Sequence, residues 1–424
     1  MKLVVAFGLA AALGAPTGPG QDELRARDQQ ELVEEFCELD EWSPAGQARM
    51  AEILDTLAVV PELDDGDVRK WEKRIEKHWK RAPELEKQSG RHFLYPDAEP
   101  AQARGKYIVG GETKRPKGLV IAMHGGGVGS GDAEPMAQGY DSEAKERKLL
   151  MIAPEVLAKT ERGWTDAGTE EFVLQLIQRA LVTWDIDPER VYLSGHSMGG
   201  YGSWAIGAHH ADWCAGLAPS AGGPTPVMDM TGKMFDVVEG MIPNMRNVRL
   251  VVYQSDDDVQ VPPEPNQLAA KKIAEARERW GGYDFEYWEV TGQGHAAPPG
   301  GYGALLDKIV DHERVVWPDT VVWQPTLAWD HDFYWLHWDE PLRNAIVHAV
   351  AEDNVITIET SLVGGKGLGV WLDERLVDLD EPVKVVLNGE EVFEGEVAAR
   401  LDVLVESAAR RDAQYLTAYR IDLD

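Results

Sequence analysis

Between residues 104 and 316 the sequence alternates short apolar segments with segments of helical period, and this alternation restricts the fold more than any other feature. Strands that alternate with helices form a mostly parallel sheet with helices on both faces, so we expect an α/β domain here. The expected strands are residues 106–109, 118–123, 149–153, 191–194, 216–219, 250–254 and 285–290, and the expected helices are residues 142–148, 169–184, 199–209, 266–280 and 305–315.

A glycine-rich turn follows one of these strands. Residues 195–200 read GHSMGG and separate strand 191–194 from a helix of small residues. In this context a G-x-S-x-G sequence is typical of a nucleophile elbow, a sharp turn that lifts a serine out of the backbone. Glycines flank the serine because a β-carbon there would contact neighbouring strands, and the next helix directs its free N–H groups at the serine oxygen. Ser197 is therefore the candidate nucleophile.

A second glycine-rich loop, residues 124–127, reads HGGG and directly follows strand 118–123. In hydrolases with a nucleophile elbow, such a loop gives one amide N–H to the oxyanion hole, and the residue after the nucleophile gives the other. We therefore expect Gly126 and Met198 to form the oxyanion hole, with the glycines on either side of Gly126 as alternatives. We expect His124 to be structural.

A serine nucleophile needs a base, and the base needs an acid that orients it. In this type of sheet the chain order is nucleophile, acid, histidine. His295 lies in a loop with two glycines directly after strand 285–290. His209, His210 and His312 fall in or next to helical patterns. His295 is therefore the expected base.

Three consecutive aspartates, residues 256–258, follow strand 250–254 at the place expected for the orienting acid. All three carboxylates cannot point at one imidazole ring. The D-x-x-V-P pattern that starts at Asp258 favours this residue, and Asp256 is the alternative. We expect the remaining carboxylates in a solvated loop or at the cap of the next helix.

These motifs resemble the α/β-hydrolase superfamily, and more narrowly the group of feruloyl esterases, acetylxylan esterases and polyhydroxyalkanoate depolymerases. The resemblance rests on residues 124–127, 195–199, 258–262 and 294–295, and it covers residues 105–315. It implies an α/β-hydrolase fold and a serine esterase that works through a Ser-Asp-His triad and an acyl-enzyme, with no metal and no cofactor.

The resemblance also implies the substrate, a carboxylic ester that is a small molecule, a carbohydrate-linked ester or a polyester. Prolyl-oligopeptidase-like serine peptidases share the same motifs and are the alternative. Their propeller-bearing members need several blades of about 40–50 residues each. Residues 21–95, which precede the core, read as helices and not as blades.

The N-terminal flank, residues 21–95, is charged and carries apolar residues at helical spacing. Trp71, Ile75 and Trp79 share one face of an expected helix, and such a face must pack against another part of the protein. We expect a helical region here.

The C-terminal flank, residues 318–424, reads as short strands with one helix near residues 401–411. The Asn-Gly pair at residues 388–389 is a strong hairpin signal. We expect a small β-sandwich-like domain. The many aromatic residues of the segment 323–338 fit its core, and a polysaccharide-docking face is the alternative. Trp164, which follows a strand end, is expected to line the substrate pocket.

Composition limits the class of partner. Lysine and arginine total 42 and aspartate and glutamate total 73, so the net charge is −31. This charge argues against binding of nucleic acid or anionic lipid, since both need clustered cations. Residues 1–15 combine one lysine, an apolar run and a small-residue exit, which is typical of a signal peptide. We therefore expect a secreted or periplasmic protein without stable membrane insertion. The two cysteines, Cys37 and Cys214, are expected to be buried free thiols, and one disulfide between them is the alternative.

Overall fold

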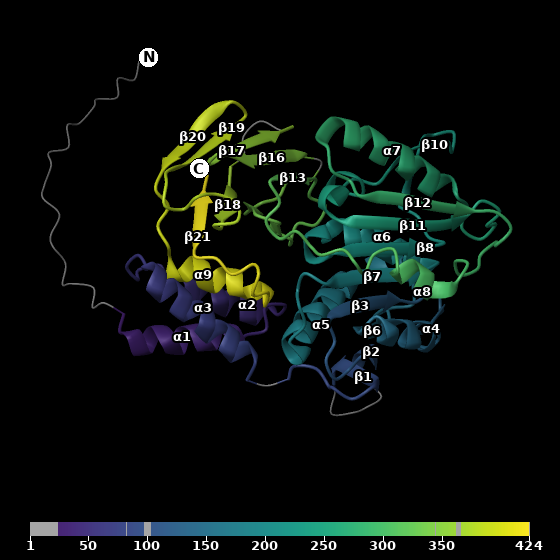
Figure 1. The fold of residues 1–424 in the computed structure, drawn as a ribbon, viewed down its shortest axis with the longest axis horizontal. Helices are drawn as coiled ribbons and strands as arrows, with labels where there is room; N and C mark the ends of the chain where they lie inside the picture. Colours follow the sequence, from purple (N-terminus) through teal and green to yellow (C-terminus); the bar gives the residue numbers. More distant parts are fainter. Residues whose placement is uncertain (1–23, 82, 97–102, 344, 362–365, 424) are drawn as a thin grey trace, which may run out of the picture.

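The computed structural model describes residues 24–81, 83–96, 103–343, 345–361 and 366–423. The expected signal peptide, residues 1–15, lies outside the described residues. A large sheet forms the centre of the α/β part, with strand order β1-β2-β6-β3-β7-β8-β11-β12 (Figure 1). Neighbours from β6 to β12 are parallel, and β2 is antiparallel to both β1 and β6. The strands are β1 (Gly90–Tyr95), β2 (Arg104–Gly111), β3 (Gly118–Met123), β6 (Leu149–Pro154), β7 (Val191–His196), β8 (Gly216–Ser220), β11 (Arg249–Ser255) and β12 (Phe285–Val290).

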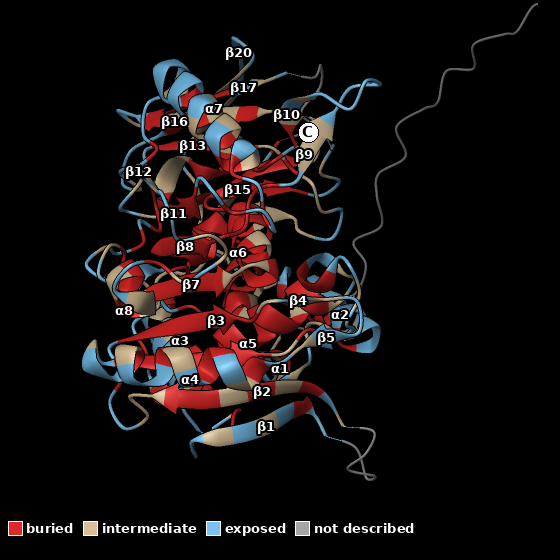
Figure 2. Ribbon diagram, turned by 90° about the vertical axis from the view of Figure 1, so that its right-hand side faces the viewer, coloured by how far each residue is buried: buried red, intermediate tan, exposed pale blue. Residues whose placement is uncertain are grey.

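Helices cover both faces of this sheet, as the alternating pattern predicted. Successive side chains of a strand point to opposite faces. Leu119 and Ile121 of β3 belong to the apolar cluster that includes α5, α6 and α7. Val120 and Ala122 belong to the cluster that includes α4 and α8. Burial on both sides explains why the central strands are continuous apolar runs (Figure 2). These helices are α4 (Ala133–Glu146), α5 (Thr169–Trp184), α6 (Met198–His209), α7 (Glu264–Trp280) and α8 (Gly301–Leu306).

Two helices differ in extent from the prediction. Helix α4 starts well before the expected residues 142–148, because the Asp132 side chain caps it by accepting a hydrogen bond from the Glu134 N–H at 3.0 Å. Helix α8 ends at Leu306, although a helix was expected over residues 305–315. Beyond it, the Tyr192 hydroxyl lies within hydrogen-bond distance of two main-chain carbonyls, those of residues 310 and 312, and this contact from β7 stabilises a non-helical path.

The N-terminal helices are α1 (Ala26–Glu38), α2 (Pro44–Leu57) and α3 (Asp65–Trp79). The predicted apolar face of α3 is buried, and it packs with α1, α2 and the C-terminal helix α9 (Leu401–Ser407) (Figure 1). Residues 90–95, which were expected to belong to this helical region, instead form β1 at the edge of the large sheet. Only Leu94 of β1 is buried, so the strand depends on pairing with β2 rather than on a local apolar pattern.

The C-terminal region contains two sheets that enclose an aromatic core, as expected for a sandwich-like arrangement. The Asn-Gly hairpin is confirmed, since residues 388 and 389 have φ of 50° and 84° and join β19 to β20. One sheet has the order β13-β16-β17-β19-β20, and the other has the order β14-β15-β18-β21. Their strands are β13 (Thr320–Trp323), β14 (Asp332–Phe333), β15 (Leu336–Trp338), β16 (Val347–Glu352), β17 (Val355–Thr360), β18 (Leu368–Leu372), β19 (Val383–Leu387), β20 (Glu390–Gly395) and β21 (Tyr419–Asp422).

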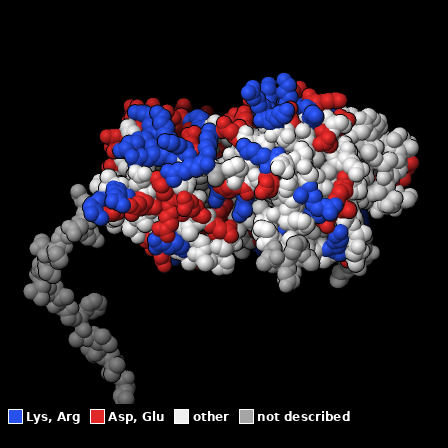
Figure 3. All heavy atoms as spheres, turned by 90° about the horizontal axis from the view of Figure 1, so that it is seen from below, with Lys and Arg blue, Asp and Glu red and all other residues white. Residues whose placement is uncertain are grey.

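Charged side chains of both signs lie on the surface. In the view of Figure 3, lysine and arginine side chains gather in clusters, and acidic side chains lie beside and between them. Among the described helices, none has both the length and the apolar content needed to cross a bilayer. Cys37 and Cys214 are both buried and unbonded to each other, and burial raises the pKa of each thiol.

Buried ion pairs join the C-terminal region to the α/β part. Arg410, which follows α9, donates from Nη2 to Oδ2 of Asp212 at 2.7 Å, and Asp212 lies just after α6. A second buried pair joins Arg314 to Asp412, and Arg314 also donates to the Asp212 carbonyl at 2.9 Å. Because these charges are removed from water, each depends on its partner.

We predict that Arg410→Met lowers the free energy of unfolding by about 3–5 kcal/mol, because it leaves the Asp212 carboxylate buried without its cation. Urea unfolding followed by tryptophan fluorescence measures this change. Arg27→Met is the matched control, since it breaks an exposed pair with Glu31 on α1 and should leave the midpoint unchanged. Equal midpoints for the two variants would contradict the prediction.

A second prediction concerns pH. Burial alone would lower the pKa of His337, but the hydrogen bond and charge of Asp332, 2.8 Å away, outweigh burial and raise this pKa to about 9. The folded pKa lies above the ordinary value of 6.5, so the pair stabilises fully below pH 6.5, and its contribution is lost as pH rises through about 9. Urea unfolding at several pH values from 6.5 to about 9 measures how much the free energy of unfolding falls. This fall should be smaller in the double variant His337→Gln/Asp332→Asn than in the wild type. An unchanged pH dependence in that variant would rule out this pair as its source.

Candidate active site

Ser197 occupies a sharp turn between β7 and α6. Its φ of 58° and ψ of −120° are unusual for a residue with a side chain, and its N–H donates to the carbonyl of Ser220 on β8 at 2.9 Å. A β-carbon added to Gly199 would lie 2.0 Å from the carbonyl oxygen of Met123, and one added to Gly195 would lie 2.4 Å from the carbonyl oxygen of Gly199. The glycines of the motif are therefore required by the close approach of α6 to β3.

The structure brings Ser197, His295 and Asp258 together from three loops at the carboxyl edge of the sheet. Nε2 of His295 is 2.9 Å from Oγ of Ser197, and Nδ1 of His295 is 2.7 Å from Oδ2 of Asp258. The side chain of His295 is 13% exposed, and that of Asp258 is fully buried. A proton can therefore pass from the serine hydroxyl to an imidazole that is oriented by a buried carboxylate.

The Asp258 carboxylate is held by several donors. Oδ1 accepts the N–H groups of Gln260 and Val261, both at 2.9 Å, and Oδ2 faces His295. Burial raises the pKa of Asp258, but the hydrogen bonds from Val261, His295 and Gln260 outweigh burial and hold this pKa below its ordinary value. The carboxylate thus stays charged at neutral pH.

The other two aspartates hold the loop that carries His295, a role that the sequence did not suggest. Asp257 accepts the N–H groups of Gly292 at 3.1 Å and Gly294 at 3.0 Å. The Thr291 hydroxyl donates to Asp256 at 2.8 Å. Asp256 and Asp257 are both exposed, as expected for a solvated loop, and their carboxylates bind the loop after β12 instead of capping the next helix.

The HGGG loop lies against Ser197. A β-carbon added to Gly125 would be 3.2 Å from Cβ of Ser197, which makes Gly125 a second candidate donor beside Gly126. Gly126 belongs to a short strand pair, β4 (Gly126–Gly127) with β5 (Ser130–Gly131). Met198 is the first residue of α6, so its N–H has no partner within the helix.

His124 fixes the shape of this loop. Its Nε2 accepts the N–H of Val156 at 3.2 Å, so the proton lies on Nδ1, which donates to the carbonyl of Gly125 at 2.8 Å. Burial lowers the pKa of His124, which keeps the ring neutral. This arrangement agrees with the structural role expected for His124.

Trp164 does not line a pocket, and that prediction was wrong. Its side chain is 1% exposed, its indole N–H donates to the His124 carbonyl at 3.1 Å, and its ring packs on the α6 residue Gly202. The Gly163-Trp164 segment fills the space between the HGGG loop and α6, so Trp164 supports the loop from behind.

His196, inside the serine motif, lies beside His295, with ring centroids 5.0 Å apart. Burial and the charge of His295 lower the pKa of His196 to about 4, and its Nδ1 lies 3.0 Å from Oγ of Ser220. A neutral neighbour adds no positive charge next to His295 when that ring takes up a proton. Sequence reasoning missed His196, although its position directly before Ser197 could have marked it as a residue of the site.

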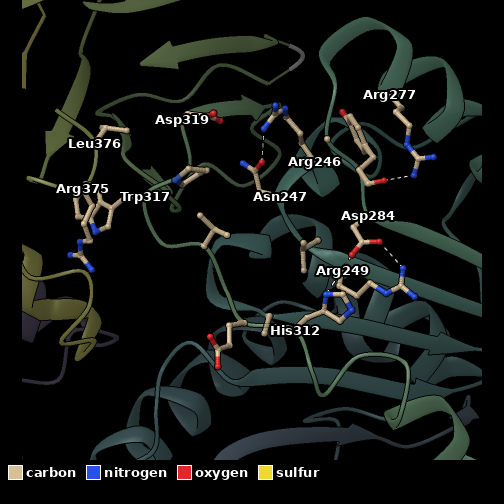
Figure 4. Close-up of a pocket in the computed structure, with 17 residues that line it drawn as sticks. Arg246, Asn247, Arg249, Arg277, Asp284, His312, Trp317, Asp319, Arg375 and Leu376 are labelled. Carbon is tan, nitrogen blue, oxygen red and sulfur yellow. Dashed lines mark hydrogen bonds and ion pairs between the residues drawn. The ribbon is translucent and has the colours of Figure 1, made fainter. Parts of the chain in front are cut away.

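A large cavity of about 840 Å³ lies away from these residues (Figure 4). It is near the amino ends of β11 and β12, and its wall includes Arg246, Arg249 and Arg277. Arg246 donates to the Thr320 carbonyl at 3.0 Å, and Arg249 pairs with Asp284 at 2.6 Å. The Arg246 contact connects the α/β part to the C-terminal region, whereas the Arg249 pair lies within the α/β part, so both arginines already have structural partners.

No family model matches the chain. A bifunctional acetylxylan esterase/xylanase from Neocallimastix patriciarum is 29% identical over 154 residues, which cover 31% of this chain and 22% of that protein. The match thus spans about a fifth of the relative. Among solved structures, a ferulic acid esterase from Anaeromyces mucronatus is 18% identical over 53% of this chain and 89% of its own, with a TM-score of 0.37. A poly(3-hydroxybutyrate) depolymerase from Bordetella parapertussis is 17% identical over 49% and 85%, with a TM-score of 0.36.

The strand order, the single antiparallel strand β2 within the sheet and the serine turn between β7 and α6 are each found directly in the structure. They confirm the fold that the motifs predicted. This chain has the α/β-hydrolase fold, and it is similar to esterases of that fold.

Proposed function

We propose that this protein hydrolyses carboxylic esters, with Ser197 as nucleophile, His295 as general base and Asp258 as the orienting acid. The observation that carries the proposal is the continuous hydrogen-bonded chain from the Ser197 hydroxyl through the His295 ring to the Asp258 carboxylate. Similarity to an acetylxylan esterase supports an ester as the substrate.

The reaction proceeds in two halves. The Ser197 oxygen attacks the ester carbonyl while Nε2 of His295 takes its proton, and the tetrahedral intermediate expels the alcohol, which receives that proton. The acyl group then remains on Ser197. His295 next takes a proton from water, the water attacks the acyl-enzyme, and the acid leaves as Ser197 regains its proton.

The negative charge of each intermediate develops on the former carbonyl oxygen. We assign its stabilisation to the N–H of Met198 at the start of α6 and to an N–H of the HGGG loop, Gly126 or Gly125. Removal of one oxyanion-hole donor typically costs about 3–4 kcal/mol of transition-state stabilisation. Because His124 and Trp164 support this loop, the donors are fixed before substrate binds.

We further propose that the esters are carbohydrate-linked or of polyester type and that the protein acts outside the cytoplasm. The name of the acetylxylan esterase relative supports the first part, and the pattern of residues 1–15 supports the second. Cell fractionation tests the location, and recovery of the protein in the cytoplasm alone would overturn it. N-terminal sequencing of the exported protein tests whether residues 1–15 are removed as a signal peptide, and a mature chain that begins at Met1 would rule out that removal.

We predict that Ser197→Ala reduces kcat for p-nitrophenyl acetate by about 10⁴-fold or more, because it removes the attacking oxygen. Ser203→Ala on the same helix is the matched control. Circular dichroism checks that both variants fold, and a fluorophosphonate probe should label the wild type and Ser203→Ala but not Ser197→Ala. Retained turnover in folded Ser197→Ala would overturn the mechanism.

We also predict that Asp258→Asn reduces kcat by about 10³–10⁴-fold, because the amide no longer holds His295 in the required tautomer. Asp256→Asn is the comparison, since its carboxylate contacts Thr291 and not His295. A loss in Asp256→Asn as large as that in Asp258→Asn would refute the assignment. Parallel assays of an ester and the matching amide separate an esterase from a peptidase, and faster amide cleavage would refute the esterase proposal.

A further inference from the structure

A cavity of about 380 Å³ lies where the N-terminal helices, α5 and the C-terminal region meet. Its wall includes Trp42, Trp213 and Trp329, which come from three distant parts of the sequence. The volume falls within the range of small-molecule sites, which are lined mainly by apolar and aromatic groups with a few polar groups that fix orientation.

Two of these indoles form a corner. The rings of Trp42 and Trp329 are 6.0 Å apart and inclined at 75°. The indole N–H of Trp42 donates to Oε1 of Gln178 on α5 at 2.9 Å, which fixes that ring. Trp329 is 37% exposed, although the other aromatic residues of the segment 323–338 are buried. This tryptophan therefore departs from the core role that fits its neighbours.

The Trp329 ring rests on a buried histidine. His210 stacks on it with ring centroids 5.6 Å apart and an inclination of 29°. His210 is 1% exposed and lies between carboxylates of Asp330, at 3.2 Å, and Glu170, at 3.5 Å. Ion contacts on both sides hold the imidazole, so one face of Trp329 is supported in a fixed position. A surface fixed in advance loses little conformational entropy on binding.

Four carboxylates lie in the wall of the cavity, and the charge of three of them is already balanced. Asp330 faces His210, Asp332 faces His337 at 2.8 Å, and Glu41 faces Arg411 at 3.5 Å.

Within the described part of the chain, the Glu171 side chain in the same wall makes no hydrogen bond or ion pair. Carboxylate oxygens accept several hydrogen bonds each, so the site can bind a ligand that carries many hydrogen-bond donors. Because most of the carboxylates are already paired, such a ligand needs no positive charge of its own.

We propose that this aromatic corner binds a neutral, hydroxyl-rich ring, that is, a saccharide unit. The apolar faces of such a ring pack against the indoles, and its hydroxyls donate to the carboxylates around them. An aromatic acid would be repelled by Glu171, the carboxylate of this wall without a cationic partner among the described residues. A quaternary ammonium ion would favour a cage with uncompensated negative charge, whereas most carboxylates of this site have cationic partners.

The corner lies far from the candidate nucleophile. Helix α6 begins next to Ser197 and ends next to His210, and its 12 residues span about 18 Å at 1.5 Å per residue. The site would therefore hold a part of a glycan chain that does not react. Its use in ester hydrolysis rests on the proposed function, whereas saccharide binding itself does not.

Isothermal titration of the full chain with xylohexaose tests the inference, because this probe has no ester and binding does not require turnover. We expect binding at millimolar concentration or tighter in the wild type, and at least a tenfold rise in Kd in Trp329→Ala. Glu171→Lys, which extends a longer side chain into the cavity, should weaken binding similarly. Trp280→Ala, a partly buried tryptophan outside this cavity, is the matched control and should bind as the wild type does.

Failure of the wild type to bind xylohexaose, or unchanged binding in both cavity variants when thermal melting shows that they are folded, would overturn the inference. Binding of tetramethylammonium or ferulate at this corner in place of the sugar would also overturn it. If xylohexaose binds as expected and no ester is hydrolysed, the binding site stands and the proposed function fails.

Discussion

The close contact between the first turn of α6 and the end of β3 is the constraint on which the site depends. At Gly199 the two backbones are so near that no β-carbon fits, and this approach forces the turn at Ser197 into its unusual conformation. The same approach places the start of α6 beside the HGGG loop. One steric requirement thus sets the position of the serine oxygen, the direction of the Met198 N–H and the site of the second glycine-rich loop.

The remaining groups are positioned by contacts between neighbouring loops. β11 and β12 are adjacent and parallel, so the aspartate loop and the histidine loop leave the sheet side by side. Asp256 and Asp257 bind Thr291 and the main chain of Gly292 and Gly294. Of the three carboxylates, only that of Asp258 then contacts the His295 ring. The run of three aspartates is therefore one structural unit in which two residues set the position of the loop and the third sets the tautomer of the ring.

Much of the α/β part could be predicted from the sequence, because its information is local. Buried parallel strands read as apolar runs, and Ser197, Asp258 and His295 each follow such a run in a short motif. The structure brings these three side chains together as the order of the motifs suggested.

The features that sequence reasoning missed depend on contacts between distant residues. Strand β1 exists because it pairs with β2, and Trp164 is buried because Gly202 leaves room for its ring. In the aromatic segment 323–338, Trp329 differs from its neighbours because Trp42 and His210 hold it. The partners of Trp164 and Trp329 are distant in sequence, and β1 has only one buried residue, so periodicity and spacing carry little signal for any of them.

The buried thiols have a consequence for chemistry around the protein. Burial raises the pKa of Cys37 to about 12 and raises that of Cys214 as well, so the reactive thiolate is scarce at both positions near neutral pH. Oxidants and alkylating agents attack the thiolate form and need access to it. Both thiols of the folded protein are therefore protected from oxidants and alkylating agents, so such reagents can modify the thiols of other proteins in a mixture while these two stay unmodified.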